Sequence, residues 1–484
     1  MQAGMQRLMA GYSRQPSANQ QTNQKRSGQN PQRPRSAWAM NWFSLATMIV
    51  IVLAGLAACG GTAASQQGGK VNLTYALWDP NEQIGYQKSI NEFEQQHPNI
   101  HVTIEQIPWG QYWQKLDTEF AAGDAPDVFW DHVAYFPQFA QQGVLMNLNP
   151  LIQKDKLDLS VYYPQLLKQF MYNGNYYGLP KDWDTIALLY NKNIFKQMGI
   201  TMPSNLTWNP TDGGTFLPFL QKLTVDKNGL HPNQAGFNPN AVKQYGFVSE
   251  NNSQELYWNY IAMNGGTFLN KPFGSNFEFN QPSSVQALQF LVNLITKWHV
   301  SPSAAETNTV SGADETMFAR GQAAIIEKGD WNLSYLINQV NFPMGVAELP
   351  VGPDGRISVF NGLSDAIYAK TPHPQQSWEL FKWLASPQSQ QIMGQGGYIW
   401  PAVQSEDQAF QQYWQSKGLD VTPYLQEAQG QTTSFPITPA YNEASTKITS
   451  EFNLMFLGQV SVQQATNVAV QQGNAAIQAA NTGG

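Results

Sequence analysis

The sequence predicts an α/β fold built from interwoven parts, and three observations lead to this prediction. From Lys70 onward, short runs of β-branched or aromatic residues alternate with longer amphipathic segments, which is typical of layered α/β structure. The chain has 484 residues, of which 42% are hydrophobic, so it is long enough for two or three domains. No long linker and no repeat of fixed period separates these domains, so we expect interwoven lobes.

The first part of this region predicts two successive βαβ steps. The predicted strands are 71–78, 100–106 and 127–130, and the predicted helices between them are 83–97, which Pro98 ends, and 111–122. Further elements follow the same alternation. They are strands at 187–190, 323–327 and 344–349, helices at 253–264 and 284–299, and a helical pair within 372–393 that Ser386-Pro387 interrupts.

The N-terminal part has the features of an export signal. Six basic residues precede the apolar run 42–55, and Leu56-Ala57-Ala58-Cys59 follows it. This last motif resembles the bacterial lipobox, whose cysteine becomes the lipidated first residue. We predict a signal peptide over 1–58, lipidation of Cys59, and a flexible lipid-anchored tether over 59–69. An uncleaved transmembrane anchor is the alternative, because the run 38–58 approaches the ~20 residues that span a bilayer.

The distribution of charge argues against nucleic acid and phosphorylated ligands. Taking the six N-terminal basic residues out of the formal net charge of −7 leaves −13 for the rest of the chain. That remainder contains only two arginines, Arg320 and Arg356. Phosphate recognition relies on clustered Arg and Lys side chains, so we expect no nucleic-acid partner.

The motifs of common catalytic and metal sites are absent from the sequence. Cys59 is the only cysteine, which excludes an intramolecular disulfide and a cysteine-based zinc cluster. The six histidines are scattered, and no H-E-x-x-H pair, G-x-S-x-G elbow or Walker A loop is present. We therefore expect no metal, no cofactor and no catalytic residue.

Paired carboxylates leave two interpretations open. Asp182 and Asp184 lie in one segment, and Asp124, Asp127 and Asp131 lie in another. A glycosidase needs two carboxyl groups about 5 to 9.5 Å apart across the scissile bond, and sequence spacing does not exclude this. Carboxylates near tryptophans also suit passive sugar binding, because they accept hydrogen bonds from hydroxyls while indole faces cover the C–H faces of the ring.

Several segments, in a fixed order from Lys70 to the C-terminal helices, resemble the family 1 extracellular solute-binding proteins of ABC importers. This family includes maltose-, multiple-sugar- and glycerol-3-phosphate-binding proteins. The segments that carry the resemblance are Pro126–Trp130 with Gly143–Leu148, Tyr177–Pro180 with Leu189–Lys192, Phe318–Ala324 leading to Gly329-Asp330-Trp331, Asn361-Gly362, Ser377–Leu384 and Tyr398–Ala402.

The resemblance implies a two-lobed periplasmic-binding-protein fold of type II, in which crossovers join the lobes and act as a hinge. It places the crossovers near 181–184, 359–362 and 434–438. The N-terminal lobe would then comprise 70–181 and 362–434, and the C-terminal lobe 183–360 and 438–484.

The resemblance also implies a set of ligand-binding residues. Asp184 falls where the maltose-binding protein has a ligand-binding Glu, and Trp331 falls on the main stacking tryptophan of that protein. Tyr441 or Asn442 occupies a position where the same protein stacks another Trp. The full set of expected ligand contacts is Trp78, Asp79, Trp130, Asp131, Asp184, Glu250, Trp258, Trp331, Asn361 and Tyr398.

These observations predict a carrier that catalyses no reaction. It would be a monomer anchored outside the cell membrane by its lipid, and it would capture a mono- or oligosaccharide and deliver it to the transmembrane subunits of an ABC permease. Two alternatives remain. One is a secreted glycoside hydrolase. The other is a binding protein for polyamines or other cations, in which Asp79, Asp131 and Asp184 would surround an ammonium between aromatic walls.

Overall fold

The computed structural model describes residues 70–482 except 272 and 309–311, and most strands in this part of the chain form two five-stranded sheets. The strand order is β2-β1-β3-β14-β6 in the first sheet and β12-β8-β11-β10-β9 in the second. The first sheet consists of β2 (Ile100–Gln106), β1 (Val71–Leu77), β3 (Val128–His132), β14 (Leu363–Ile367) and β6 (Gly178–Pro180). The second consists of β12 (Met344–Ala347), β8 (Ile186–Asn191), β11 (Ala323–Gly329), β10 (Val242–Phe247) and β9 (Val225–Asp226).

The first sheet confirms the two predicted βαβ steps. β1 is parallel to β2, from Val71 opposite Ile100 to Leu77 opposite Gln106, and it is also parallel to β3. Helix α1 begins directly after β1, because Asp79 accepts hydrogen bonds at Oδ1 from the backbone N–H groups of Asn81 (2.7 Å) and Glu82 (2.9 Å). This N-cap fixes the position of the chain at the end of the strand.

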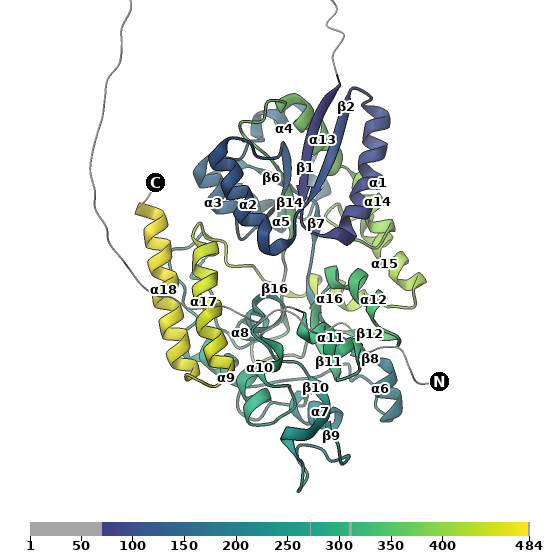
Figure 1. Ribbon diagram of the computed structural model, residues 1–484, viewed down its shortest axis with the longest axis vertical. Coiled ribbons are helices and arrows are strands. Elements are labelled where there is room, and N and C mark those ends of the chain that lie inside the picture. Colours follow the sequence, from purple (N-terminus) through teal and green to yellow (C-terminus); the bar gives the residue numbers. More distant parts are fainter. Residues whose placement is uncertain (1–69, 272, 309–311, 483–484) are drawn as a thin grey trace, which may run out of the picture. The chain divides into compact units, whose positions relative to one another are not determined.

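Each sheet is covered by its own set of helices (Figure 1). The helices around the first sheet are α1 (Pro80–Gln96), α2 (Trp109–Ala122), α3 (Phe136–Gln142), α4 (Asn149–Asp155), α5 (Pro164–Gln169), α13 (Pro374–Leu384), α14 (Pro387–Gln395) and α15 (Asp407–Ser416). The remaining helices are α6 (Lys192–Gln197), α7 (Phe216–Leu223), α8 (Trp258–Met263), α9 (Pro282–Thr296), α10 (Ala304–Thr307), α11 (Ala313–Ala319), α12 (Leu333–Gln339), α16 (Thr422–Gln429), α17 (Tyr441–Phe456) and α18 (Val462–Thr482).

The two sheets are interwoven along the chain, as predicted. The chain leaves the first sheet after β6, builds the second sheet, and returns to the first sheet at β14. Two of the connecting segments are joined to each other, because Asp184 N donates to Asn361 O at 2.9 Å and Asn361 N donates to Asp184 O at 3.1 Å. The α/β two-lobed fold class is therefore confirmed.

Helix α16 packs on the second sheet, although the predicted boundaries assign residues 362–434 to the N-terminal lobe. Tyr424 O accepts a hydrogen bond from Thr185 Oγ1 at 2.8 Å, and the Tyr424 hydroxyl donates to Lys328 O at 3.1 Å. Strand β16 (Gln431–Thr433), which follows α16, pairs in parallel with β13 (Ile357–Val359). These contacts favour a return of the chain to the second lobe before α16.

The predicted helix 253–264 is irregular at its start. Ser253–Tyr257 form a π-helical turn, called η3, and α8 begins at Trp258. The wider turn accommodates the side chain of Asn259, whose Nδ2 donates to Gln254 O at 2.9 Å, while Asn252 Oδ1 accepts from Glu255 N at 3.1 Å. Such turns are frequent at functional sites. Here the turn carries Gln254 and Glu255.

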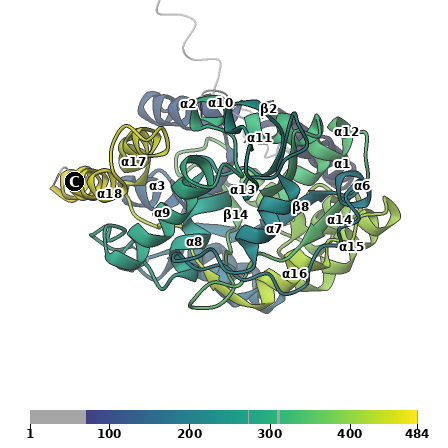
Figure 2. The same ribbon diagram turned by 90° about the horizontal axis from the view of Figure 1, so that it is seen from below.

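The C-terminal helices α17 and α18 lie side by side in both views (Figures 1 and 2). Between residues 70 and 482, none of the described helices combines the length and apolar composition needed to cross a membrane. Cys59, the predicted signal peptide and the tether lie outside the described residues.

Candidate ligand-binding cleft

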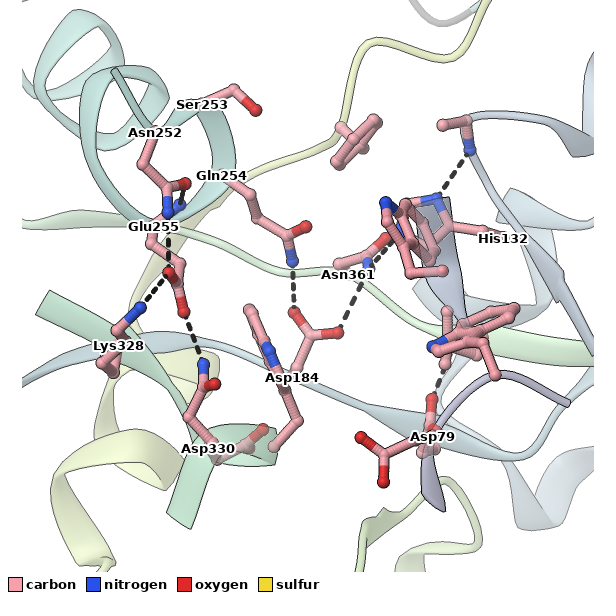
Figure 3. A pocket seen from close by; sticks show the side chains of 18 of the residues that line it. Asp79, His132, Asp184, Asn252, Ser253, Gln254, Glu255, Lys328, Asp330 and Asn361 are labelled. Atoms are coloured by element: carbon pink, nitrogen blue, oxygen red, sulfur yellow. Dashed lines mark hydrogen bonds and ion pairs between the residues drawn. The ribbon is translucent and has the colours of Figure 1, made fainter. Parts of the chain in front are cut away.

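A cavity of about 930 Å³ is lined by residues from both sets of elements and from the segments that connect them. The first sheet contributes Trp78 and His132 at the ends of β1 and β3, and the second sheet contributes Asp330 and Trp331 directly after β11. Asp184 and Asn361 come from the crossovers (Figure 3). Ligands of sheet-containing α/β proteins commonly bind at the ends of strands in this way.

One side of the cavity is aromatic. The Trp78 ring centroid lies 5.1 Å from that of Trp109, which lies 5.7 Å from His132. His132 lies 4.8 Å from Phe435, and Phe435 lies 5.0 Å from Tyr441. Trp109 is 45% exposed, so much of its ring is available to a ligand. These rings meet edge to face, and an exposed ring face among them suits the apolar face of a sugar ring.

A second aromatic surface is the ring of Trp331, which lies directly over Gly329. A Cβ atom built on Gly329 would lie 1.8 Å from Trp331 Cζ3 and 2.1 Å from Cη2. The backbone of Gly329 has φ −73°, which any residue can adopt. Glycine is therefore needed here because the indole lies so close, and not because the backbone requires a positive φ. The absence of a side chain at position 329 thus leaves the space that the Trp331 ring occupies.

The crossovers bring three polar side chains together at the centre of the cavity. Asp184 accepts hydrogen bonds from Gln254 Nε2 at 2.8 Å and from Asn361 Nδ2 at 3.1 Å, and Asn361 Nδ2 also lies 3.2 Å from His132 Nε2 (Figure 3). Burial raises the pKa of Asp184 to about 8, with a further contribution from the charge of Asp182. Burial lowers the pKa of His132 to about 3, so this ring is neutral at pH 7.

Lys328 forms ion pairs with three acidic side chains at the end of the cavity nearest the second sheet. Its Nζ lies 2.8 Å from Glu255 Oε2, 2.8 Å from Asp314 Oδ2 and 2.6 Å from Glu315 Oε1. Burial, followed by the charge of Asp314, raises the pKa of the nearby Glu250 to about 8. Among the described residues, no three His, Cys, Asp or Glu side chains are placed to hold a metal ion.

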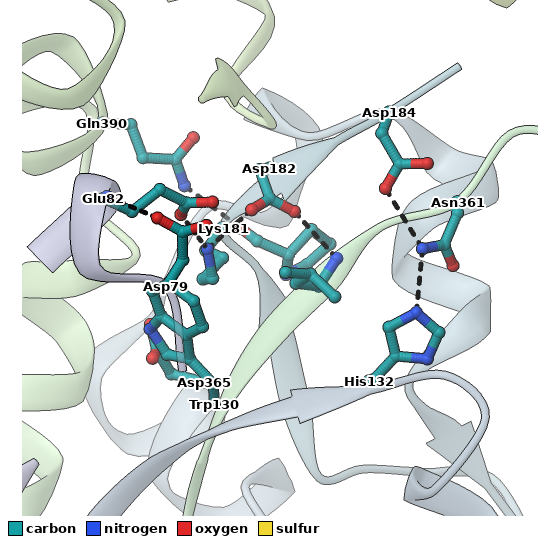
Figure 4. A network of polar contacts seen from close by, with 12 residues as sticks. Asp79, Glu82, Trp130, His132, Lys181, Asp182, Asp184, Asn361, Asp365 and Gln390 are labelled. Atoms are coloured by element: carbon teal, nitrogen blue, oxygen red, sulfur yellow. Dashed lines mark hydrogen bonds and ion pairs between the residues drawn. The ribbon is translucent and has the colours of Figure 1, made fainter. Parts of the chain in front are cut away.

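A second buried lysine lies behind the first-sheet wall (Figure 4). Lys181 Nζ is 2.6 Å from Asp182 Oδ2, 3.3 Å from Glu82 Oε2 and 4.0 Å from the centroid of the Trp130 ring. Trp130 Nε1 donates to the Tyr75 hydroxyl at 2.6 Å. This network joins the first crossover to α1 and to the interior of the first sheet.

A sequence profile described as bacterial extracellular solute-binding protein matches residues 88–419, which is more than half of the chain. This chain belongs to that family. The match covers most of the first sheet, the whole second sheet and most of the cavity lining.

Solved structures and sequence relatives agree with this assignment. The crystal structure of M. tuberculosis UspC is 32% identical, with a TM-score of 0.70, and the alignment covers 84% of this chain and 100% of that one. The Listeria monocytogenes ABC substrate-binding protein Lmo0181, solved in complex with cycloalternan, has the same fold, with 24% identity, a TM-score of 0.73 and coverage of 84% and 99%. The maltodextrin-binding protein MdxE of Bacillus subtilis is 26% identical over 67% of this chain and 72% of its own length.

In this solute-binding protein, seven of the ten predicted ligand contacts line the cavity. They are Trp78, Asp79, Asp184, Glu250, Trp331, Asn361 and Tyr398. The structure brings them together from six separate segments of the chain. Their contact with a ligand stays a prediction.

The other three predicted contacts lie behind the cavity wall. Trp130 is fully buried beneath Trp78, with ring centroids 4.7 Å apart. Asp131, the next residue on β3, points to the opposite face of the sheet from Trp130 and His132. Trp258 is 3% exposed and packs with its ring centroid 4.3 Å from that of Phe435, which takes its place in the lining.

Sequence reasoning missed several residues that line the cavity. Trp109 lies three residues after the predicted strand 100–106, and this placement was a usable signal, whereas Phe435 follows β16, a strand that was not predicted. The three acidic residues in contact with Lys328, which are Glu255, Asp314 and Glu315, were not predicted, because they come from η3 and α11, which are distant from each other in the sequence. The missed lining residues include Trp109, His132, Tyr135, Gln254, Glu255, Asp314, Glu315, Lys328, Asp330 and Phe435.

Proposed function

We propose that this protein captures a carbohydrate in the cavity and delivers it, chemically unchanged, to the membrane subunits of an ABC importer. The observation that carries the proposal is the combination of two aromatic surfaces with buried carboxylate and amide groups in one cavity. Aromatic faces cover the C–H faces of a pyranose, and the polar groups accept or donate hydrogen bonds to its hydroxyls. A volume of about 930 Å³ gives room for more than one sugar ring.

The relatives support a carbohydrate as the solute. Proteins similar to this chain include a maltodextrin-binding protein and a galactooligosaccharide-binding protein of Bacillus subtilis, the latter 22% identical over 91% of this chain and 98% of its own length. A similar structure contains cycloalternan. We propose a monomer that closes its lobes over the sugar and docks in that form on the permease.

Calorimetric titration of the purified protein with maltodextrins, galactooligosaccharides, spermidine and a peptide mixture tests this function. We expect at least one oligosaccharide to bind and to be recovered intact by chromatography. Binding of spermidine or peptides in the absence of any sugar binding would overturn the proposal. Hydrolysis that disappears in Asp184→Asn would also overturn it, because the protein would then be a glycosidase.

The contact between Gly329 and Trp331 provides a test of the stacking surface that leaves the tryptophan in place. We expect Gly329→Ala to displace the indole, because the added methyl group would overlap its six-membered ring. Sugar affinity should fall about tenfold, which corresponds to about 1.4 kcal/mol, and tryptophan fluorescence should change. As a control, Gly110→Ala adds a methyl group where nothing lies within 4 Å, and it should leave affinity unchanged. Unchanged affinity in Gly329→Ala would show that the indole position does not matter.

We also propose that Cys59 carries lipid and anchors the protein outside the cell membrane. The support is its place directly after Leu56-Ala57-Ala58 and the preceding apolar run. One acyl chain gives only marginal binding, so stable anchoring needs more than one. We expect Cys59→Ala to prevent lipid incorporation and signal-peptide cleavage, as seen by mass spectrometry and by metabolic labelling with a fatty acid. If the natural protein carries no lipid and remains unprocessed in the membrane, the uncleaved transmembrane anchor is correct.

A further inference from the structure

Among the described residues that line the cavity, acidic side chains far outnumber basic ones. Nine acidic residues line it, whereas Lys328 is the one lysine among its described lining residues, and Lys181 lies directly behind the wall. If all nine were ionised, the two lysines would leave seven negative charges without a neutralising partner. Burial raises the pKa of Glu82, Asp184 and Glu250 to about 8, so protonation removes part of this charge in the free protein. The nine are Asp79, Glu82, Asp182, Asp184, Glu250, Glu255, Asp314, Glu315 and Asp330.

One of these carboxyl groups, that of Asp330, has an oxygen that nothing in the described chain satisfies. Asp330 is 4% exposed, and its Oδ2 atom is buried without a hydrogen-bond partner. The pKa of Asp330 is raised by burial and then by the charges of Asp184 and Asp182. A buried carboxylate oxygen without a donor is costly, so this atom is a place for a ligand group that supplies a proton or a positive charge.

The position of Asp330 in the chain places its carboxyl group next to the ring of Trp331. Asp330 directly precedes Trp331 in the chain. Among the nearby charges, that of Asp184 raises the pKa of Asp330 most. A ring that stacks on Trp331 would therefore present its substituents to two carboxyl groups. The lysines are already engaged by other carboxylates, Lys328 by Glu255, Asp314 and Glu315, and Lys181 by Asp182 and Glu82.

We propose that the solute is a carbohydrate bearing a protonated amino group, and that its ammonium binds Asp330 and Asp184 beside the ring of Trp331. This rests on the proposed function and narrows its substrate class. An ammonium group has three donors and a full positive charge, so it satisfies Asp330 Oδ2 and reduces the repulsion between the two carboxylates. A hydroxyl donates one hydrogen bond and leaves that repulsion unchanged.

The buried carboxyl groups also predict how binding depends on pH. Burial raises the pKa of Asp184 to about 8, so in the free protein this group is largely protonated at pH 7. An ammonium favours the ionised form, and binding should release a proton. Affinity for the amine should therefore rise between pH 5 and pH 6.5, the range in which the sugar amine and the free Asp184 are both protonated, while affinity for a neutral sugar should not. The charged and titratable groups around this pair are Glu82, Lys181, Asp182, Glu255, Lys328 and Tyr424.

The experiment compares sugars that differ only in their amino group. The probes are the β-linked trimer of glucosamine, the same trimer fully N-acetylated, and maltotriose as a second neutral sugar, each titrated calorimetrically at pH 5 and pH 6.5. We expect the amine to bind at least tenfold more tightly than either neutral trimer at pH 6.5, with a smaller difference at pH 5. Titrations in two buffers of different ionisation enthalpy should show proton release for the amine alone.

Asp330→Asn should reduce the preference for the amine to less than threefold, because the amide keeps the shape and removes the charge. Asp184→Asn serves as the second variant if Asp330→Asn does not fold. The control is Glu92→Gln, which removes an exposed carboxylate on α1 and should keep the preference.

Three results would overturn the inference. If the neutral trimers bind as tightly as the amine, or more tightly, the proposed sugar-binding function stands, but the inference that the solute carries an amino group is rejected. A preference that survives in both folded aspartate variants would place the amine elsewhere. Binding of spermidine without binding of any sugar would reject the proposed function itself.

Discussion

Trp331→Ala should bind the cognate sugar roughly thirty-fold or more weakly than the natural protein, while the fold is retained. The ring lines the cavity beside Asp330 and is partly exposed, so it is free to cover one face of a pyranose. Truncation of buried aromatic anchors at binding interfaces commonly costs about 2 kcal/mol or more, and 1.4 kcal/mol is a tenfold change in affinity. Calorimetric titration measures the effect, and circular dichroism checks the fold.

Trp383→Ala is the matched control for this experiment. Trp383 lies on α13 away from the cavity, and its Nε1 donates to Ser89 O at 3.1 Å and to Ser89 Oγ at 2.9 Å, which ties α13 to α1. This variant should lower the melting temperature and leave the sugar affinity nearly unchanged. If Trp331→Ala retains full affinity in a folded protein, the sugar stacks on another surface, and the Trp78–Trp109 surface would be the next to examine.

Lys181→Met should lower the free energy of unfolding at pH 7 by about 3 to 5 kcal/mol, the range found when one partner of a buried ion pair is removed. Lys181 is fully buried, and its ammonium is the cation nearest to Asp182 and Glu82. Methionine fills much of the same volume but leaves both carboxyl groups without a counter-charge. Burial already raises the pKa of Glu82 to about 8, and the charge of Lys181 opposes this rise. Without the lysine, the carboxyl groups should take up protons.

Denaturant unfolding of Lys181→Met measures the loss, and Lys447→Met is the control. Lys447 forms an exposed ion pair with Glu443 at 3.7 Å, and exposed pairs of this kind contribute little to stability. A Lys181→Met protein as stable as the control would mean that protonation of the carboxyl groups fully replaces the buried ammonium.

The sequence pattern predicted the elements of the fold better than the positions of side chains within them. Strand β2 has the predicted bounds, and the break at Ser386-Pro387 separates α13 from α14 because proline lacks the N–H group that a continuous helix needs. The predicted helix 253–264 is present, but its first turn is π-helical. The contact of Asn259 with Gln254 O that accompanies this turn is made by a side chain, and periodicity does not report such contacts.

The same limit explains the partial success at the candidate site. A residue at the end of a strand is placed near the cleft by topology, as for Trp78 and Trp331. Whether its side chain reaches the cavity depends on what covers it. Trp130 lies beneath Trp78, and Trp258 lies behind Phe435, and neither covering residue is close in the sequence to the residue it hides. Asp131 lies on the opposite face because adjacent residues of a strand alternate.

The pair of backbone hydrogen bonds between residues 184 and 361 has a mechanical consequence for a two-lobed protein. If the two connecting segments that contain Asp184 and Asn361 were not bonded to each other, the lobes could twist and slide relative to each other in several directions. The two hydrogen bonds join these segments into a short two-stranded ribbon. Sliding of one segment along the other would break both N–H···O bonds, whereas bending of the lobes about the ribbon leaves them intact. Asn361 also links the ribbon to the cavity through its side chain. Lobe movement should therefore follow a single arc, and distances between fluorophores on the two lobes should change along one coordinate.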